Sequence, residues 1–309
     1  MNRMKTFPIC LFAFNRPDKL TQCIDAILDN ANCQLFELYV FCDGPRNIDE
    51  YEIVERVRVI ARSITGFKNV TVHESNTNKG LANSVIDGVS LVLEANSGVI
   101  VIEDDILVST HFLEFMNEAL NMYENDPEIA SVHGNFPSLK FRLPSTFLLK
   151  YSDCWGWGTW KDSWTLLNLD SLDLMNLIRE SGRINEFNVY GAYPFFDLLQ
   201  KEYSGAVDSW AIRWHASLFV NHKLSLYSKF SLIYNIGTDG SGLHKDSFSL
   251  LDRRSKIATP QLTRISIRPN RLATIFYAFG LLTVRFKLLA RALLQWAKHM
   301  LSLRGFNIR

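Results

Sequence analysis

The segment GVIVIEDDILV, residues 98–108, constrains the fold of this chain more than any other part of the sequence. Its apolar run, Val99 to Ile102, is typical of a strand buried on both faces, and the three carboxylates that follow mark where the strand leaves the core. In an open α/β sheet, ligands bind at the carboxyl ends of the strands. Adjacent carboxylates there suit a divalent cation, Mg²⁺ or Mn²⁺, that bridges to phosphate oxygens. The segment therefore predicts a site that handles diphosphates.

The three acids also have a simpler interpretation. Acidic triplets occur in solvated loops and in the first turn of a helix, which Ser109 would cap here. The residues before the triplet favour a diphosphate site over a solvated loop, because strands and helices alternate along this part of the sequence. Strands are expected at 8–15, 37–45, 69–75 and 98–105, with helices between them whose apolar residues are spaced three and four apart. This alternation predicts an α/β fold with a mostly parallel sheet flanked by helices.

The alternation stops after a helix expected at 109–125 and a short strand at 129–135. The sequence then becomes polar and aromatic up to about residue 250, and its regular elements cannot be assigned from the pattern. Four of the seven tryptophans fall within ten residues: Trp155, Trp157, Trp160 and Trp164. Such a group either forms a wall of a sugar or base pocket, since aromatic faces stack on both, or packs in the core.

Several common motifs are missing from the sequence. No G-x-G-x-x-G follows the first strand, and no G-x-x-x-x-G-K-[ST] occurs, so neither dinucleotide binding nor a P-loop is expected. No H-E-x-x-H or G-x-S-x-G is present either. A parallel sheet that has acids at a strand end but lacks a glycine-rich phosphate loop is expected to hold phosphates through a metal ion.

The net charge of +1 conceals an asymmetry. The segment from Arg253 to Arg309 holds 12 of the 33 Lys and Arg residues and none of the 32 Asp and Glu residues. The two parts are therefore expected to face different partners. We expect no nucleic-acid partner. The five cysteines are odd in number and lack C-x-x-C spacing, which indicates buried thiols in a reducing compartment.

Taken in order, the motifs resemble those of GT-A fold glycosyltransferases. The resemblance runs from about Phe7 to Phe248. It comprises AFNRPDKL after the first strand, Asp43 after the second, SNTNKGLA, the EDD motif, DCWGWGTW, a DSW element and a glycine-rich turn followed by a histidine. The set is most similar to eukaryotic N-acetylglucosaminyltransferase I and to bacterial transferases that build surface polysaccharide. It implies a GT-A, Rossmann-like sheet, although DSWAIRW departs from the double-Asp version of the animal enzyme.

The resemblance implies roles for individual residues. Asp105 would bind Mn²⁺ or Mg²⁺, and the ion would grip both phosphates of a UDP-sugar donor. Glu103 and Asp104 would hold the sugar, the ribose or metal-bound water. Asp43 would meet the uracil or the ribose. The nucleotide slot after the first strand would be lined by Phe14 and Arg16.

An inverting transfer needs a carboxylate outside the EDD motif. The acceptor hydroxyl must lose its proton as it attacks the anomeric carbon, and the departing diphosphate must be neutralised. Asp208 is the first candidate for this base, because it lies beside Trp210, which could shield it, and before Arg213, which could hold it. An exposed loop aspartate is the simpler interpretation. Asp153 is the second candidate.

His244 follows Gly237, Gly240 and Gly242. A flexible loop of this kind could close over the diphosphate and add a metal or phosphate contact from the histidine. A surface histidine on a mobile loop is the alternative.

The last part of the chain, 251–309, is expected to be a basic amphipathic helical tail. From Leu282 to Met300, apolar residues recur at alternating spacings of four and three, and Lys287, Arg291 and Lys298 fall on the opposite side. Such a helix either binds an anionic membrane surface or packs on the domain or on another subunit. No apolar stretch reaches the roughly 18 to 20 residues needed to span a bilayer. We therefore expect a cytoplasmic protein, peripheral on the inner face of the plasma membrane.

The sequence thus predicts a catalytic domain at 1–250, with a nucleotide-sugar half at about 1–108 and an acceptor half at about 109–250, followed by the tail. The expected activity is a metal-dependent, inverting transfer of a hexosyl or N-acetylhexosaminyl group from a UDP-sugar to a glycan or lipid-linked acceptor, in cell-surface polysaccharide assembly. A sugar-nucleotide nucleotidyltransferase uses a similar sheet but normally carries a glycine-rich basic loop after the first strand. A non-catalytic, peripheral membrane glycan-binding module is the other alternative.

Overall fold

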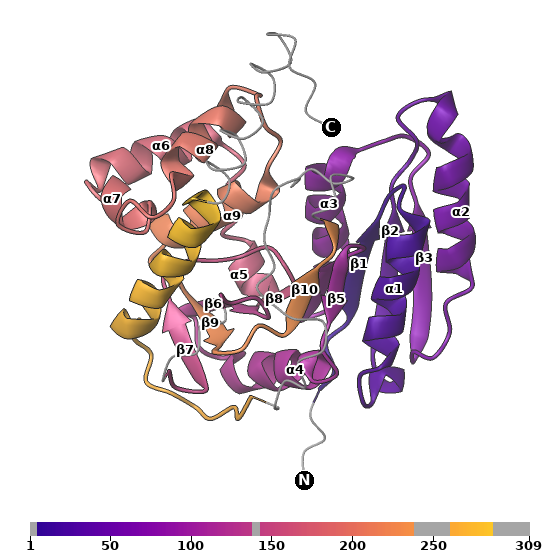
Figure 1. The fold of residues 1–309 in the computed structure, drawn as a ribbon, viewed down its shortest axis with the longest axis horizontal. Helices are drawn as coiled ribbons and strands as arrows, with labels where there is room; N and C mark the ends of the chain where they lie inside the picture. Colours follow the sequence, from indigo (N-terminus) through magenta and orange to yellow (C-terminus); the bar gives the residue numbers. More distant parts are fainter. Residues whose placement is uncertain (1–4, 138–142, 238–259, 287–309) are drawn as a thin grey trace, which may run out of the picture.

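The computed structural model describes residues 5–137, 143–237 and 260–286. Its centre is an eight-stranded sheet in the order β3-β2-β1-β4-β8-β6-β9-β7 (Figure 1). The first four strands of this order are parallel, and β8 and β7 run antiparallel to their neighbours. The mostly parallel sheet predicted from the sequence is confirmed. The strands are β1 (Ile9–Ala13), β2 (Glu37–Cys42), β3 (Asn69–Glu74), β4 (Gly98–Glu103), β6 (Ile129–His133), β7 (Thr146–Leu149), β8 (Trp157–Trp160) and β9 (Leu224–Ser228).

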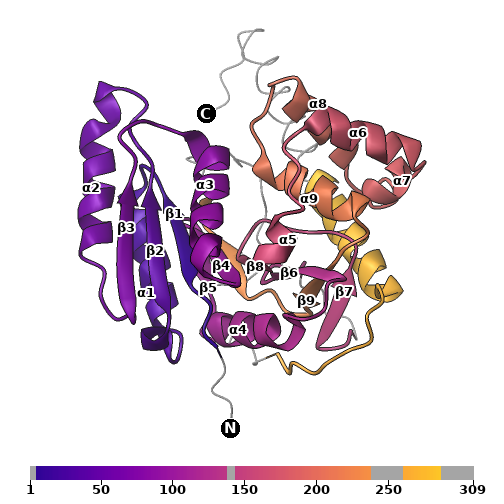
Figure 2. The same ribbon diagram turned by 180° about the vertical axis from the view of Figure 1, so that it is seen from behind.

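Helices cover both faces of this sheet (Figure 2). Every residue of β1 and β4 is buried, as expected for central strands that carry apolar side chains on both faces. One face packs against α1 (Pro17–Leu28), α2 (Tyr51–Arg62) and α4 (Phe112–Tyr123). The other face packs against α3 (Gly80–Ala95), α5 (Lys161–Trp164) and α9 (Trp210–Val220). Pro17 begins α1, where its fixed φ and missing N–H are tolerated.

The second half of the chain adds a smaller layer beside the sheet. α6 (Ser171–Glu180), α7 (Ile184–Phe187) and α8 (Phe195–Tyr203) pack with α9 around their own apolar cluster. A separate two-stranded ribbon pairs β5 (Ile106–Val108) with β10 (Ile233–Asn235). This ribbon brings residues 233–237 beside the acids that end β4.

The tryptophan group is mostly core. Trp157, Trp160 and Trp164 are buried, and the rings of Trp157 and Trp164 lie 5.8 Å apart. Trp155 is only partly buried. The core interpretation is therefore confirmed for three of the four, and Trp155 alone is left to line a cavity.

Residues 260–286 pack against the sheet. The backbone N–H of Asn270 donates to the carbonyl of Leu148 in β7 (2.8 Å), and a helix at 271–286 buries Ala273 and Tyr277. Of the amphipathic stripe, Leu282 is partly buried beside Tyr277 and Phe286 is exposed; the residues beyond Phe286 lie outside the described part. Within the described ranges, no helix is long and apolar enough to cross a membrane.

All five cysteines are free thiols. Cys10, Cys23, Cys33 and Cys42 are buried, as the sequence predicts, and Cys154 is partly buried. Burial raises the pKa of the Cys10 and Cys23 thiols well above the usual value, which keeps them protonated and inert.

Candidate active site

The carboxyl ends of three neighbouring strands bring most of the expected site residues together. Phe14 and Arg16 follow β1, Asp43 follows β2, and Glu103 to Asp105 end β4. Backbone hydrogen bonds continue past the strands, from the Asp43 N–H to the Ala13 carbonyl (3.0 Å) and from the Asp104 N–H to the Phe12 carbonyl (2.9 Å). The sheet itself therefore positions the acids.

Arg16 bridges two of these acids. Its Nη1 lies 2.7 Å from Asp105 Oδ2 and its Nε lies 3.4 Å from Asp104 Oδ2, while Nη2 contacts Asp104 Oδ1. The Arg16 side chain is 19% exposed, that of Asp105 11% and that of Asp104 1%. A guanidinium matches carboxylates through its planar fork, which makes this a well-formed, largely buried ion pair.

The cluster holds more acid than Arg16 can neutralise. Burial raises the pKa of Glu103 well above its usual value, and the nearby charge of Asp105 adds to this effect. Burial also raises the pKa of Asp104, to about 6, against the opposing effect of Arg16. Further positive charge at this point would therefore favour the ionised acids.

The donor atoms fit a divalent cation held jointly by protein and substrate. Asp105 Oδ1 is buried and has no hydrogen-bond partner among the described residues, and a carboxylate oxygen of this kind is a hard ligand suited to Mg²⁺ or Mn²⁺. Gly237 approaches so closely that a Cβ there would lie 2.1 Å from Asp105 Oδ2. No group of three or more His, Cys, Asp or Glu ligands surrounds one point in the part of the chain that the structure describes. Beyond Asp105, substrate phosphates, water and residues outside the described part are the remaining sources of ligands. His244 lies outside the described residues.

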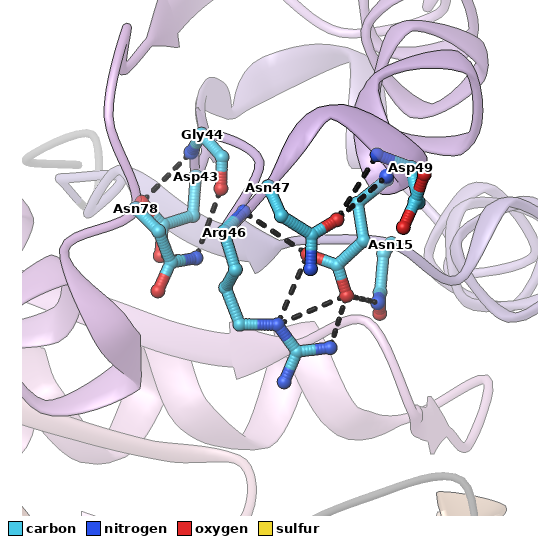
Figure 3. Close-up of polar contacts among 8 residues, drawn as sticks. Asn15, Asp43, Gly44, Arg46, Asn47, Asp49 and Asn78 are labelled. Atoms are coloured by element: carbon cyan, nitrogen blue, oxygen red, sulfur yellow. Dashed lines mark hydrogen bonds and ion pairs between the residues drawn. The ribbon is translucent and has the colours of Figure 1, made fainter.

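Asp43 organises the loop that begins α3 (Figure 3). Its Oδ1 accepts the N–H groups of Gly44 and Lys79 (2.8 Å each), and its Oδ2 accepts Asn78 Nδ2 and the Gly80 N–H (3.0 Å each). A carboxylate offers about four lone-pair positions, and these four bonds match them. Gly80 has a φ of +76°, which favours glycine. The contact of Asp43 with a nucleoside stays a prediction.

The loop after β2 also carries Arg46, whose side chain reaches back to Glu50 (Figure 3). Arg46 lies over the Phe14 ring, 5.2 Å from its centroid, and its Nε donates to Glu50 Oε1 (2.9 Å). Glu50 Oε1 also accepts Asn15 Nδ2 (3.3 Å). Arg46 and Glu50 are absent from the sequence-based site. The Gly-Pro turn before Arg46 was the available signal, because it places the next residues at the same sheet edge.

Asp208 stands at the start of α9, across from α3. Its side chain is 62% exposed and its Oδ1 lies 3.7 Å from Arg213 Nη2, so the expected cation is present. Its Oδ2 lies 3.6 Å from the position that a Cβ on Gly80 would take. Trp210 turns into the core against Trp157 instead of covering the carboxylate, so the expected aromatic shielding is not found. Asp208 thus lies between the two halves of the chain.

Asp153, the second candidate base, is held rigidly. Its Oδ1 accepts the N–H groups of Cys154 (2.6 Å) and Trp155 (3.1 Å), and its Oδ2 accepts Asn135 Nδ2 (2.7 Å). Its charge contributes to the raised pKa of Glu103, after burial and the charges of Asp105 and Asp104.

Two solved structures that are similar to this chain share little sequence with it. A mannosyltransferase, PcManGT from Pyrobaculum calidifontis, solved with GDP-Man and Mn²⁺, is 15% identical with a TM-score of 0.29, over 42% of this chain and 35% of that one. S. aureus TarS is 13% identical with a TM-score of 0.39, over 75% of this chain and 36% of that one. The chain therefore spans about a third of the length of each.

A search of curated proteins found no match. The family model "Glycosyl transferase family 2" matches residues 9–170, which is more than half of the chain and includes β1, β2, β4 and the acids at their ends. The chain therefore belongs to glycosyl transferase family 2.

Proposed function

We propose that this glycosyltransferase moves a hexosyl or N-acetylhexosaminyl group from a UDP-sugar to a hydroxyl of a glycan or lipid-linked acceptor. One observation carries the proposal. A buried cluster of three carboxyl groups at the end of β4 is only partly neutralised by Arg16, and Asp105 Oδ1 has no partner among the described residues. Such a cluster favours a second cation and, with it, a diphosphate. Membership of the family favours glycosyl transfer over nucleotidyl transfer and over glycan binding alone.

Asp105 would hold Mn²⁺ or Mg²⁺ through Oδ1. When bound, the ion would supply positive charge for the departing diphosphate. Arg16 is placed beside it on the loop after β1, where a guanidinium can exchange a carboxylate partner for a phosphate oxygen. Phe14 offers a ring face to the nucleobase of the donor, and Arg46 already lies over that ring. Glu103 and Asp104 would contact the donor sugar, the ribose or metal-bound water. Asp43 would contact the uracil or ribose by exchanging one of its four bonds to the loop before α3.

Asp208 would act as the base of an inverting transfer. Its carboxylate takes the proton of the acceptor hydroxyl while the hydroxyl oxygen bonds to the anomeric carbon and the electron pair of the broken bond leaves on the diphosphate. Arg213 would orient it. Its exposure is consistent with this role, because an incoming acceptor must reach it, and the bound acceptor would exclude water.

We further propose a place in cell-surface polysaccharide assembly, with the protein peripheral on the inner face of the plasma membrane. The support is the basic composition of residues 253–309, and the tail would bring the enzyme to a lipid-linked acceptor. We propose that residues 1–250 carry catalysis and that residues 251–309 carry membrane binding. In the fold, residues 260–286 pack on the sheet.

Calorimetry with UDP, in Mn²⁺ and in excess chelator, tests the donor assignment. We expect UDP to bind only with the metal. A screen of nucleotide sugars for slow hydrolysis in Mn²⁺ then identifies the donor. Hydrolysis of a GDP-sugar without hydrolysis of any UDP-sugar would overturn the assignment of uracil as the nucleobase of the donor. UDP binding of equal affinity in chelator would overturn the metal dependence.

A further inference from the structure

A cavity of about 240 Å³ lies between α8, α9, the loop after β7 and the helix at 271–286. Its walls are largely aromatic and aliphatic, and among its polar groups Asn135 donates through Nδ2 to Asp153 Oδ2 (2.7 Å). The lining side chains that bear on its function are Asp153, Trp155, Tyr193, Phe195, Tyr277 and Val284.

The cavity adjoins the candidate active site. Ser231, in its wall, donates through Oγ to the Ile233 carbonyl (3.0 Å), and Ile233 lies in β10, the strand that pairs with β5 directly after Asp105. The cavity is also lined by Ser209, the residue that follows Asp208. A ligand in the cavity would therefore lie beside the ribbon that follows Asp105 and beside the residue that follows the proposed base.

The chemistry of the walls suits a sugar ring. Tyr193 and Phe195 lie with ring centroids 4.7 Å apart and present aromatic surface to the cavity. Aromatic faces pack on the apolar C–H face of a pyranose, while Asp153 and Asn135 provide hydrogen-bonding groups for hydroxyls. The volume is below the usual range for a drug-sized ligand, which limits the occupant to about one ring.

We propose that this cavity binds one pyranose ring of the acceptor, and that the helix at 271–286 forms its outer wall and takes part in acceptor selection. The helix is closely fitted, because a Cβ on Gly280 would lie 2.5 Å from Pro137 Cβ. Tyr193, Phe195 and the helix lie outside the segment matched by the family model, residues 9–170. The assignment of the ring to an acceptor rests on the proposed function, but the saccharide site does not.

Two variants on one helix test the proposal. Val284→Trp adds an indole into the cavity, whereas Ile275→Trp adds the same indole at a position that is 61% exposed. A second pair of variants removes a ring instead. Tyr193→Ala removes a ring from the cavity wall, and its control, Tyr203→Ala, removes a ring that is 55% exposed at the end of α8. Thermal unfolding of each variant checks that it is folded.

The probes are methyl α- and β-pyranosides of glucose, galactose, mannose and N-acetylglucosamine, observed by saturation-transfer NMR with UDP and Mn²⁺ present. At least one should bind the wild type, and Val284→Trp and Tyr193→Ala should weaken it by about tenfold or more, a loss of about 1.4 kcal/mol. The two control variants should change it by less than about twofold. UDP affinity should be the same in all five proteins.

Two results would overturn the proposal: a wild type that binds none of these glycosides, or binding that survives both cavity variants. Failure of the proposed function is distinguishable from this. If UDP does not bind the wild type but a glycoside does, and Val284→Trp abolishes that binding, the donor chemistry is wrong and the saccharide site stands.

Discussion

The guanidinium of Arg16 contacts Asp105 through Nη1 and Oδ2 at 2.7 Å, and the other oxygen of this carboxylate is buried and has no partner in the part of the chain that the structure describes. Arg16 thus supplies one positive charge where the acids favour more. A divalent ion on Asp105 and the guanidinium would compete for the same negative charge. A phosphate would offer Arg16 an alternative partner, so metal and nucleoside diphosphate are expected to assist each other's binding.

Arg16→Gln should therefore raise the affinity for Mn²⁺ in the absence of nucleotide, by about tenfold or more, because a competing charge a few ångströms from the ligand oxygen is removed. Electron paramagnetic resonance of free Mn²⁺ measures this directly. Arg46→Gln is the matched control, since Arg46 lies one loop away and pairs with Glu50. Unchanged or weaker Mn²⁺ binding in Arg16→Gln would show that the two cations do not compete.

Glu103 should give the protein a pH-dependent stability. Burial raises its pKa in the folded state above the ordinary value, so the folded protein binds this proton more tightly than the unfolded chain. Stability from this group is present at acid pH and is lost as the pH rises through the raised pKa, by about 1.4 kcal/mol per pKa unit. Glu103→Gln, measured by urea unfolding in chelator, should be more stable relative to the wild type at pH 8 than at pH 5. A difference that does not vary with pH would contradict the buried, protonated state of Glu103.

Much of the donor half follows from local pattern. The runs in β1 and β4 are apolar on both faces, and spacings of three and four predict α1 to α3, so the strand ends and their acids could be placed from the sequence. The hydrogen bonds of Asp43 with Lys79 and Gly80 could not be predicted from the sequence, because they join residues 36 and 37 positions apart. The position of Asp208 opposite Gly80 and the packing of Tyr277 could not be predicted from local pattern either, because both depend on how elements distant in the sequence pack together. The polar stretch after residue 160 has weak periodicity, and tertiary contacts with α9 determine α6 to α8 there.

Asp208→Asn should leave UDP-sugar binding intact and slow transfer by about 10² to 10⁴-fold, the usual contribution of a general base. Calorimetry measures donor binding, and release of UDP in the presence of acceptor measures turnover. Asp25→Asn, at an exposed position on α1, is the control. Reduced donor affinity with normal turnover would instead make Asp208 a binding residue, and a product that keeps the anomeric configuration of the donor would rule out inversion.

Within the tail, 251–309, we expect that truncation after residue 286 leaves the fold intact and that truncation after residue 262 does not. A chain ending at Phe286 keeps Ala273 and Tyr277 in the core and should unfold at the temperature of the full protein, whereas ending at Leu262 removes both buried side chains. The full chain should sediment with phosphatidylglycerol vesicles less completely as salt rises, because charges are screened within about 10 Å at 0.1 M. The chain ending at Phe286 should stay in solution. Equal sedimentation of the two would place the membrane contact elsewhere.

The central claim is that Asp105 holds a catalytic cation for a nucleotide-sugar donor. Its most direct test is the Mn²⁺ dependence of UDP release from the UDP-sugar hydrolysed fastest, in the wild type and in Asp105→Asn. An amide cannot supply the charge of the carboxylate, so we expect turnover that requires Mn²⁺ in the wild type, stops in chelator, and is abolished in Asp105→Asn at any Mn²⁺ concentration. Full turnover by Asp105→Asn, or by the wild type in excess chelator, would contradict the account.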